Sequence, residues 1–274
     1  MTQETFPLDA YMARIGYAGP VKASEGVLEA VQRAQLATVP FENFDILLGR
    51  GVSLEPAALC QKLIHSWRGG YCFELNTLFL MALEAMGFEV RPLLARVHLS
   101  GRPSGRTHEL LLVTLRGRQW IADAGFGGPS LRAPIPLELD TLRSQDGRCY
   151  RLSDAGPFGA MLQTRKDEPW RDLYSFDLSH VDAADIALGN HFTSTHPSSH
   201  FTFSRVAALH TPSGRTTLLD RTLRRVAGDG EQTQELPEGQ EFVDALERHF
   251  GIELGVAYEA LRPLQVKRAD QTSS

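Results

Sequence analysis

The chain has 274 residues, of which 42% are apolar and 22% charged, a balance typical of a globular protein. Its formal net charge of −5 gives no electrostatic reason to expect a nucleic-acid partner. No apolar run approaches the roughly 20 residues of a membrane-spanning helix, and Met1–Pro7 lacks the basic and apolar regions of a signal peptide. We therefore expect a cytoplasmic protein that binds neither nucleic acid nor membrane.

Cysteine and arginine usage adds two expectations. Cys60, Cys72 and Cys149 cannot all pair and form no disulfide framework, which favours a reducing compartment. A local run of arginines predicts a site for a small anionic partner, such as a nucleotide-bearing cofactor. The arginines are Arg102, Arg106, Arg116, Arg118 and Arg132.

The first third of the chain has the periodicity of helices. Apolar side chains at i, i+3, i+4 and i+7 predict an amphipathic helix over 8–15. Ser24 is expected to cap a second helix, which stops before Pro40. Ser53 is expected to cap a third helix with Pro56 in its first turn.

A fourth helix and a change of period follow. The pattern predicts a helix from about Cys72 to Met86, with Gly87 at the position after a helix where glycine is favoured. Beyond it, short apolar runs separated by Gly, Pro and Arg are typical of strands. These runs are Val90–Leu99, Glu109–Leu115 and Gln119–Ala122.

The second half of the chain is less regular. Residues 129–162 suggest loops and weak strands. Phe201–Leu209 and Thr216–Arg225 are interpreted as a hairpin around Pro212-Ser213-Gly214, and a last helix is expected to end at Gly251. Helices come first, an antiparallel β region second and a mixed α/β end third, so the fold class is α+β.

Cys72 is the strongest candidate for a reactive group. Gly69 and Gly70 interrupt the chain just before the helix and place Cys72 at its N-terminus. Free backbone N–H groups and the helix dipole stabilise a thiolate there, and a base must still be supplied. Most free cysteines are simply small buried hydrophobes, and Cys60 on an ordinary helix fits that description. Cys72 fits it less well, because two glycines beside a core position are costly without a backbone reason.

His108 and Asp123 are the candidate base and its orienting carboxylate. If Arg116-Gly117 forms a two-residue turn, Leu110 lies opposite Asp123, and His108 shares its face. The two side chains are then diagonal neighbours at about 7–8 Å between backbones, and the arrangement follows the logic of a catalytic triad. A three-residue turn would put Asp123 on the other face. For His108 alone, a structural role would be the ordinary interpretation.

Five motifs in order closely resemble the arylamine N-acetyltransferase family. They extend over about 40–214, and the length and three-part organisation agree over the whole chain. The motifs are Pro40-Phe41-Glu42-Asn43-Phe44, Arg68-Gly69-Gly70-Tyr71-Cys72-Phe73-Glu74, His108-Glu109-Leu110-Leu111-Leu112-Val113, Asp123-Ala124-Gly125-Phe126-Gly127-Gly128 and His196-Pro197-Ser198-Ser199-His200-Phe201.

The resemblance implies a multi-domain α+β fold with a Cys-His-Asp core similar to that of cysteine proteases. A helical bundle (1–87) would carry Cys72, an antiparallel β-barrel (88–190) would carry His108 and Asp123, and an α/β lid (191–274) would follow. The implied reaction is ping-pong transfer of acetyl from acetyl-CoA, through a Cys72 thioester, to an aromatic amine or hydrazine. The backbone N–H of Cys72 or of Phe73 would stabilise the oxyanion.

The resemblance also assigns binding residues. Acceptor-pocket candidates are Phe41, Val97, Phe126 and Phe201, although plain core packing explains any one phenylalanine equally well. Candidates for contact with CoA are Ser104, Gly105, Gly127, Thr211 and Gly214. Ser104 stands where some relatives have threonine, which leaves that hydroxyl contact open.

One further ion pair is predicted, and two other classes of protein fit part of the pattern. A buried Glu42–Arg68 pair is expected, with Glu74 as the alternative partner of Arg68. No metal is expected at His196 and His200, because the proline between them disfavours the helical i, i+4 geometry. A transglutaminase-like or papain-like cysteine hydrolase would use the same triad with another acceptor. A non-catalytic binding protein would not need to keep all three residues of the triad.

Overall fold

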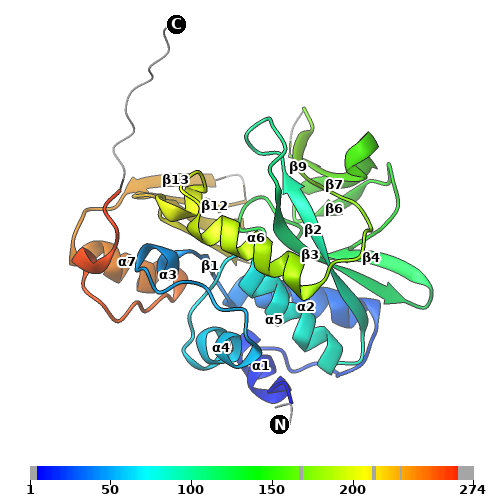
Figure 1. The fold of residues 1–274 in the computed structure, drawn as a ribbon, viewed down its shortest axis with the longest axis horizontal. Coiled ribbons are helices and arrows are strands. Elements are labelled where there is room, and N and C mark those ends of the chain that lie inside the picture. Colours follow the sequence, from blue (N-terminus) through cyan, green and yellow to red (C-terminus); the bar gives the residue numbers. More distant parts are fainter. Residues whose placement is uncertain (1–4, 167–168, 212–213, 229, 265–274) are drawn as a thin grey trace, which may run out of the picture.

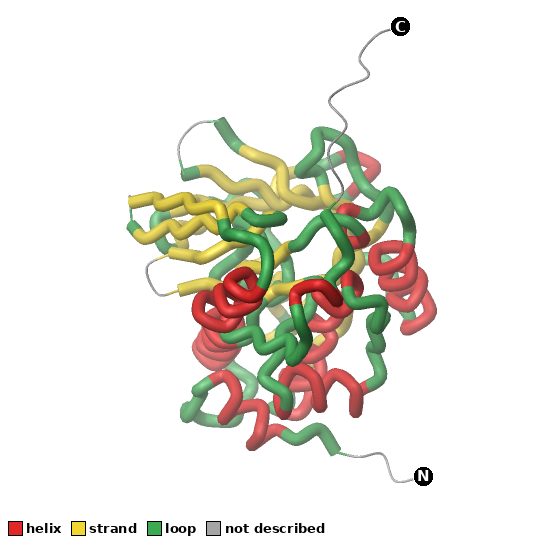
Figure 2. Tube along the Cα trace, turned by 90° about the vertical axis from the view of Figure 1, so that its left-hand side faces the viewer, coloured by secondary structure: helices red, strands yellow, loops and turns green. Residues whose placement is uncertain are grey.

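The computed structural model of the chain describes residues 5–166, 169–211, 214–228 and 230–264. Helices from the first third pack below two sheets, most of whose strands come from the rest of the chain (Figures 1 and 2). The helices are α1 Leu8–Ile15, α2 Glu25–Thr38, α3 Phe44–Leu47, α4 Pro56–Leu59, a π-helical turn η1 Cys60–His65, and α5 Cys72–Ala85.

The helical boundaries agree with the sequence pattern, and three details differ. Ser24 occupies the N-cap position of α2 but makes no side-chain capping bond. The residue before α4 is Glu55, and Ser53 instead accepts a hydrogen bond from the Glu55 N–H. Cys60 begins a π-helical turn and not an ordinary helix.

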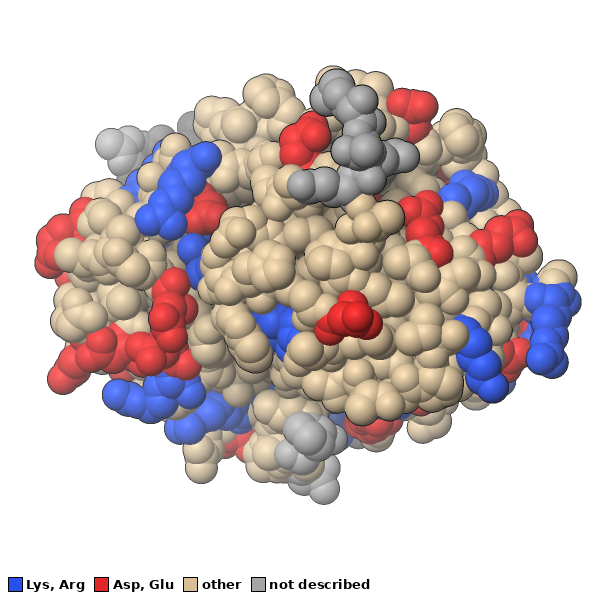
Figure 3. Space-filling model, turned by 90° about the horizontal axis from the view of Figure 1, so that it is seen from below, with Lys and Arg blue, Asp and Glu red and all other residues tan. Residues whose placement is uncertain are grey.

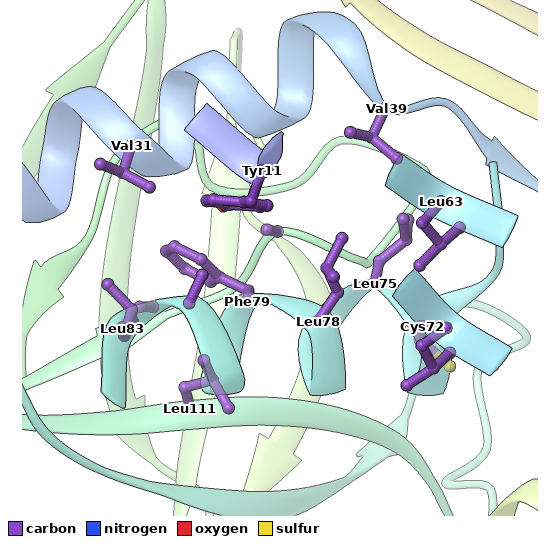
Figure 4. Close-up of a cluster of buried hydrophobic side chains, with 14 of the residues drawn as sticks. Tyr11, Val31, Val39, Leu63, Cys72, Leu75, Leu78, Phe79, Leu83 and Leu111 are labelled. Carbon is purple, nitrogen blue, oxygen red and sulfur yellow. The ribbon is translucent and has the colours of Figure 1, made fainter. Parts of the chain in front are cut away.

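The apolar stripe of α5 forms the centre of the first core. Leu75, Leu78, Phe79 and Leu83 are buried between α1, α2 and strand β3, as Figure 4 shows. Cys72 lies at the end of this buried face. The packing that stabilises α5 therefore also fixes the position of its first residue.

An antiparallel eight-stranded sheet curls into a nearly closed barrel. Its order is β5-β4-β3-β2-β9-β8-β7-β6, and its interior holds a separate cluster of apolar side chains. The strands are β2 Glu89–Val97, β3 Arg106–Leu115, β4 Arg118–Ala122, β5 Ile135–Pro136, β6 Arg143–Gln145, β7 Arg148–Asp154, β8 Ala160–Arg165 and β9 Arg171–Phe176. Residues 129–162, expected to be loops and weak strands, thus supply much of the barrel.

A second, five-stranded antiparallel sheet has the order β1-β10-β11-β12-β13. Its edge strand β1 comes from the N-terminal third, and Phe41 pairs with Ala208 of β10. Helix α7 packs on this sheet through Phe242 and Leu246. The elements are β1 Phe41–Glu42, α6 Ala183–Thr195, η3 His200–Thr202, β10 Val206–Thr211, β11 Gly214–Leu219, β12 Thr222–Ala227, β13 Gly230–Glu235, α7 Gln240–Phe250 and η4 Tyr258–Ala260.

The predicted hairpin needs correction. Strand β10 starts only at Val206, because the preceding residues form the 3₁₀ turn η3. The run Thr216–Arg225 is divided into two strands at Asp220, whose positive φ of 57° marks a tight turn. Of the expected connection, Pro212 and Ser213 lie outside the described residues, while Gly214 is the first residue of β11.

The prediction that the arginines between Arg102 and Arg132 form one cluster is wrong. Arg106 begins β3 and Arg116 follows its end, so the two are separated by the length of a strand, about 30 Å. Arg106 pairs with Asp177, and Arg118 pairs with Glu138. Proximity in sequence is lost because an extended strand intervenes.

On the surface seen from below Figure 1, the described residues form no large area of one charge. Charged side chains lie mainly around the edge of this face, and its middle is largely uncharged (Figure 3). Among the described residues, no helix is both long and apolar enough to cross a membrane.

Candidate active site

Cys72 is the first residue of α5, as the sequence indicated. The chain enters the helix through a confined turn: a Cβ on Gly69 would lie 2.1 Å from the Pro40 carbonyl oxygen, and one on Gly70 would lie 2.8 Å from Glu74. The Glu74 carboxylate accepts the Tyr71 N–H at 3.0 Å and completes the helix start. The two glycines are therefore required by close approach of backbone and side chain.

The thiol of Cys72 is 4% exposed and points toward β3. Its sulfur lies 3.7 Å from the carbonyl oxygen of Thr107, the residue before His108. Burial raises the pKa of this thiol, a hydrogen bond with the Glu109 backbone lowers it by less, and the charge of Asp123 raises it further. The backbone N–H of Phe73 lowers it, but by less. The helix N-terminus alone does not produce a thiolate here, so a base has to take the proton.

His108 and Asp123 meet across the β3–β4 hairpin in the predicted register. Leu115 pairs with Arg118, and Arg116 and Gly117 both have positive φ, as in a type I′ two-residue turn. His108 Nε2 lies 2.8 Å from Asp123 Oδ2, and both side chains are buried. Because Asp123 engages Nε2, the other ring nitrogen, Nδ1, is left for a second partner.

Asp123 is held in its ionised form. Burial raises its pKa, but His108, the Gly125 N–H and the Asn76 amide together outweigh burial and hold the pKa below its usual value. The Gly125 N–H donates to Asp123 Oδ1 at 2.9 Å. A buried carboxylate with this many donors stays charged and orients the imidazole.

Asn76 is a positioning residue that the sequence reasoning missed. Its Nδ2 donates to Asp123 Oδ1 at 3.0 Å and to the Glu109 carbonyl at 2.5 Å, while its Oδ1 accepts the Ala124 N–H at 2.9 Å. The available signal was its spacing, because residues i and i+4 lie on one helix face and Asn76 follows Cys72 by four.

The Gly125–Gly128 loop brings backbone close to both Cys72 and Phe41. A Cβ on Gly125 would lie 3.1 Å from Cys72 Cα, and one on Gly127 would lie 2.6 Å from the Phe41 ring. The backbone of this segment therefore lies against the first residue of α5 and against β1. No described helix follows it directly, which separates it from a phosphate-binding loop.

Aromatic rings surround the histidine. Phe126 and Tyr174 each lie 5.0 Å from the His108 ring, measured between centroids. The Phe41 and Phe201 rings are 5.9 Å apart. Val97, at the end of β2, pairs with Tyr174 and is half-buried. Tyr174 escaped the sequence reasoning because strand β9 was not recognised.

Four of the five expected CoA contacts fall into two separate places, and the fifth, Gly127, borders neither cavity. Ser104 uses its hydroxyl within its own loop, accepting the Val97 N–H at 2.9 Å. Gly105 borders a cavity of about 330 Å³ beside α6. The carbonyls of Thr211 and Gly214 accept hydrogen bonds from Arg132, and Gly214 borders a different cavity of about 200 Å³. The two cavities share no lining residue.

The predicted ion pair is confirmed, and His196, before η3, has ordinary surroundings. Arg68 binds Glu42 at 2.6 Å and not Glu74, which instead accepts a hydrogen bond from Lys62 at 2.8 Å. His196 bonds through Nδ1 to the Ser198 hydroxyl. Within the described ranges, no group of three or more His, Cys, Asp or Glu side chains is placed to hold a metal ion.

Comparison with known proteins shows the family of the chain. Residues 26–258 match a protein family described as N-acetyltransferase. An Escherichia coli protein named arylamine N-acetyltransferase is 36% identical over 249 residues, or 89% of this chain and 88% of that one. The solved structure of the Salmonella typhimurium arylamine N-acetyltransferase gives a TM-score of 0.85 at 36% identity, with 96% and 94% covered. The Mycobacterium marinum arylamine N-acetyltransferase in complex with CoA gives 0.88 at 34% identity, with 93% and 97% covered. The chain therefore belongs to the arylamine N-acetyltransferase family, a family of acyltransferases.

Proposed function

We propose that this protein transfers an acetyl group from acetyl-CoA to aromatic amines or hydrazines, with Cys72, His108 and Asp123 as a catalytic triad. The observation that supports it most is the buried His108–Asp123 pair beside the first residue of α5. Family membership supports the acyl transfer, and a relative solved with CoA supports the acetyl donor.

The first half-reaction acetylates Cys72. His108 Nδ1 takes the proton from the Cys72 thiol, and the sulfur attacks the acetyl carbonyl carbon of acetyl-CoA. The bond from that carbon to the CoA sulfur then breaks, and CoA leaves after taking the proton back from His108. The first-turn N–H groups of Cys72 and Phe73 are the proposed donors to the oxyanion. The raised pKa of the thiol is the reason that a positioned base is needed.

The second half-reaction transfers the acetyl group to nitrogen. The amine nitrogen attacks the Cys72 thioester and gives its proton to His108. The bond from carbon to the Cys72 sulfur breaks, and His108 returns the proton to that sulfur. Asp123 stays ionised throughout and stabilises the imidazolium, which its lowered pKa supports.

Binding residues are part of the proposal. Phe41, Val97, Phe126 and Phe201 would line the acceptor site, supported by the packing of Phe126 on His108. The CoA contacts would involve Ser104, Gly105, Gly127, Thr211 and Gly214. We also propose the division into a helical bundle (1–87), a barrel (88–190) and an α/β lid (191–274).

Mass spectrometry of the intact chain after addition of acetyl-CoA tests the mechanism. We expect release of one equivalent of CoA per chain and a mass increase of one acetyl group located at Cys72, discharged when an arylamine is added. Cys149→Ser, which changes a cysteine in β7, should behave like the native protein. A Cys72→Ala variant that acetylated arylamines at the native rate would exclude the mechanism. Rapid discharge to water alone would favour a hydrolase.

A further inference from the structure

A second cavity of about 200 Å³ lies between the barrel sheet and the five-stranded sheet. Arg148 of β7 and Arg132 border it on the barrel side, and His210, Arg215 and Arg224 border it from β10, β11 and β12. Neither Cys72 nor His108 lines it. We call it the Arg148–Arg215 cavity.

The charged side chains that border the Arg148–Arg215 cavity do not balance one another. Arg132 pairs with Asp146 at 2.9 Å, and Arg224 pairs with Glu231. Those pairs account for both carboxylates that border the cavity. Within the part of the chain that the structure describes, Arg148 and Arg215 make no ion pair and no side-chain hydrogen bond. Two guanidinium groups therefore remain as surplus positive charge.

The surplus charge is partly withdrawn from water. Arg215 is half-buried, and burial followed by the charges of Arg148, Arg224 and Arg171 lowers its pKa. His210 does not add charge, because burial and the nearby arginines lower its pKa to about 3. Its Nε2 instead lies 2.9 Å from the Ser130 hydroxyl. Like charges gathered in a partly dry cavity repel each other unless an anion neutralises them.

We propose that the Arg148–Arg215 cavity binds a phosphate group between these two guanidinium groups. Guanidinium presents paired N–H donors that match the oxygens of phosphate, and such charge-assisted bonds are the stronger class of hydrogen bond. A terminal phosphate carries about 1.5 to 2 negative charges near neutral pH, which matches two unpaired arginines better than a single carboxylate does.

Two sources of phosphate fit this chemistry. One source is acetyl-CoA, and assigning the phosphate group to acetyl-CoA rests on the proposed function. The chain connects the two sites, since Phe126 packs on His108 and Ser130, four residues later, bonds to His210 in the cavity wall. Four residues span at most about 14 Å. The other source is a separate phosphate-bearing molecule.

Titration calorimetry of the full chain with CoA, dephospho-CoA and inorganic phosphate tests the proposal. Arg148→Gln and Arg215→Gln are compared with Arg225→Gln, which removes an exposed charge from the opposite face of β12. We expect about a tenfold or larger loss of phosphate-group affinity in the first two variants and native affinity in the third.

The three ligands distinguish the sources. Weaker binding of CoA, with dephospho-CoA unaffected, identifies the 3′-phosphate of CoA. Weaker binding of both identifies its diphosphate. Native CoA affinity with weaker inorganic phosphate binding identifies a separate phosphate ligand. Native affinity for all three ligands in Arg148→Gln and Arg215→Gln overturns the proposal.

Two further readouts separate this site from the Cys72 chemistry. At saturating acetyl-CoA, the Arg148→Gln and Arg215→Gln variants should acetylate Cys72 to the full extent, whereas failure of the proposed mechanism abolishes that acetylation in the native chain too. Thermal unfolding should occur at or above the native Tm, because each substitution relieves repulsion. Reduced affinity found together with a lower Tm for both variants would indicate a structural role and overturn the proposal.

Discussion

At the scale of single residues, the candidate site depends on one carboxylate. Asp123 is fully buried and accepts hydrogen bonds from His108, Asn76 and Gly125. Its position directly after β4 is fixed by the hairpin register and by Asn76. The Asp123 carboxylate orients His108 by accepting the imidazole N–H. A neutral amide at this position could present its own N–H to the ring, which favours the wrong tautomer of the imidazole.

Replacing Asp123 with Asn should lower the rate of arylamine acetylation by about 10³- to 10⁴-fold, as loss of an orienting carboxylate does in other triads. Steady-state kinetics with acetyl-CoA measures the effect. Near-ultraviolet circular dichroism should match the native spectrum, because the side chain keeps its shape. Unaltered turnover in Asp123→Asn would remove the orienting role.

Glu109 is a buried carboxyl group to which the proposed mechanism assigns no role. It is 0% exposed, and its oxygen accepts a hydrogen bond from Thr77 at 3.1 Å. Burial holds its pKa well above the usual range, and the charge of Asp123 acts in the same direction. At a pH between the unfolded-state and folded-state pKa values, the folded protein therefore binds a proton that the unfolded chain releases.

Glu109→Gln should stabilise the protein increasingly as the pH rises. Below the unfolded-state pKa of about 4.3 both states are protonated and the substitution changes little. Above it the unfolded chain binds fewer protons than the folded one, so native stability falls with pH and the variant escapes that loss. Urea unfolding of both proteins between about pH 5 and about pH 8 measures the difference. A difference independent of pH would contradict the assignment.

At the scale of elements, the Gly125–Gly128 loop shows how backbone shape supports the site. Gly127 has a φ of 73°, and a Cβ there would meet the Phe41 ring. Gly117 in the β3–β4 turn has a φ of 77° but nothing within 4 Å of its Cβ position. Both positions have a left-handed backbone, but only at Gly127 would a Cβ also meet an aromatic ring.

This pair offers a matched test of the aromatic contact. Gly117→Ala should cost about 1–2 kcal/mol in unfolding free energy from backbone strain alone and leave acetylation unchanged. Gly127→Ala should cost more and also reduce activity, because Phe41 must move. Equal losses of stability and full activity in both variants would show that the approach to Phe41 does not matter. Urea unfolding and steady-state kinetics give the two readouts.

At the scale of the whole molecule, a buried ion pair links segments that are distant in sequence. Arg68, before α5, binds Glu42 of β1, and β1 pairs with β10 of the C-terminal sheet. Asn43 strengthens the same junction, donating to the Phe201 and Ser204 carbonyls at 2.8 and 2.7 Å. The helix that carries Cys72 and the five-stranded sheet are thereby held together.

Removing one partner of this pair should be costly. Arg68→Ala leaves Glu42 buried without its cation, and we expect a loss of about 3–5 kcal/mol in unfolding free energy. Arg33→Ala, which removes pairs with the exposed Glu29 and Asp146, should cost less than about 1 kcal/mol. Similar losses in the two variants, measured by urea unfolding, would contradict the structural role of Glu42–Arg68.

Elements with a strong local period were predictable from the sequence. The stripe of α5 and the two-residue turn at Arg116-Gly117 were assigned correctly, and the hairpin parity put His108 and Asp123 on one face. Helix α6 and strand β13 were not found. In α6 only Gly189 and Thr193 are buried, and every residue of β13 that the structure describes is exposed, so neither carries an apolar pattern.

The local features of the site were predictable from the sequence alone: a cysteine at a helix start, and a histidine and an aspartate on one face of a hairpin. These follow from side-chain periods of 3.6 and 2 and from turn geometry, which act between neighbouring residues. Three other features follow from tertiary packing: the hairpin docks against α5, Asn76 holds Asp123, and Arg148 and Arg215 face one cavity. These contacts join residues far apart in the chain, and they depend on how whole faces pack, which no local spacing encodes.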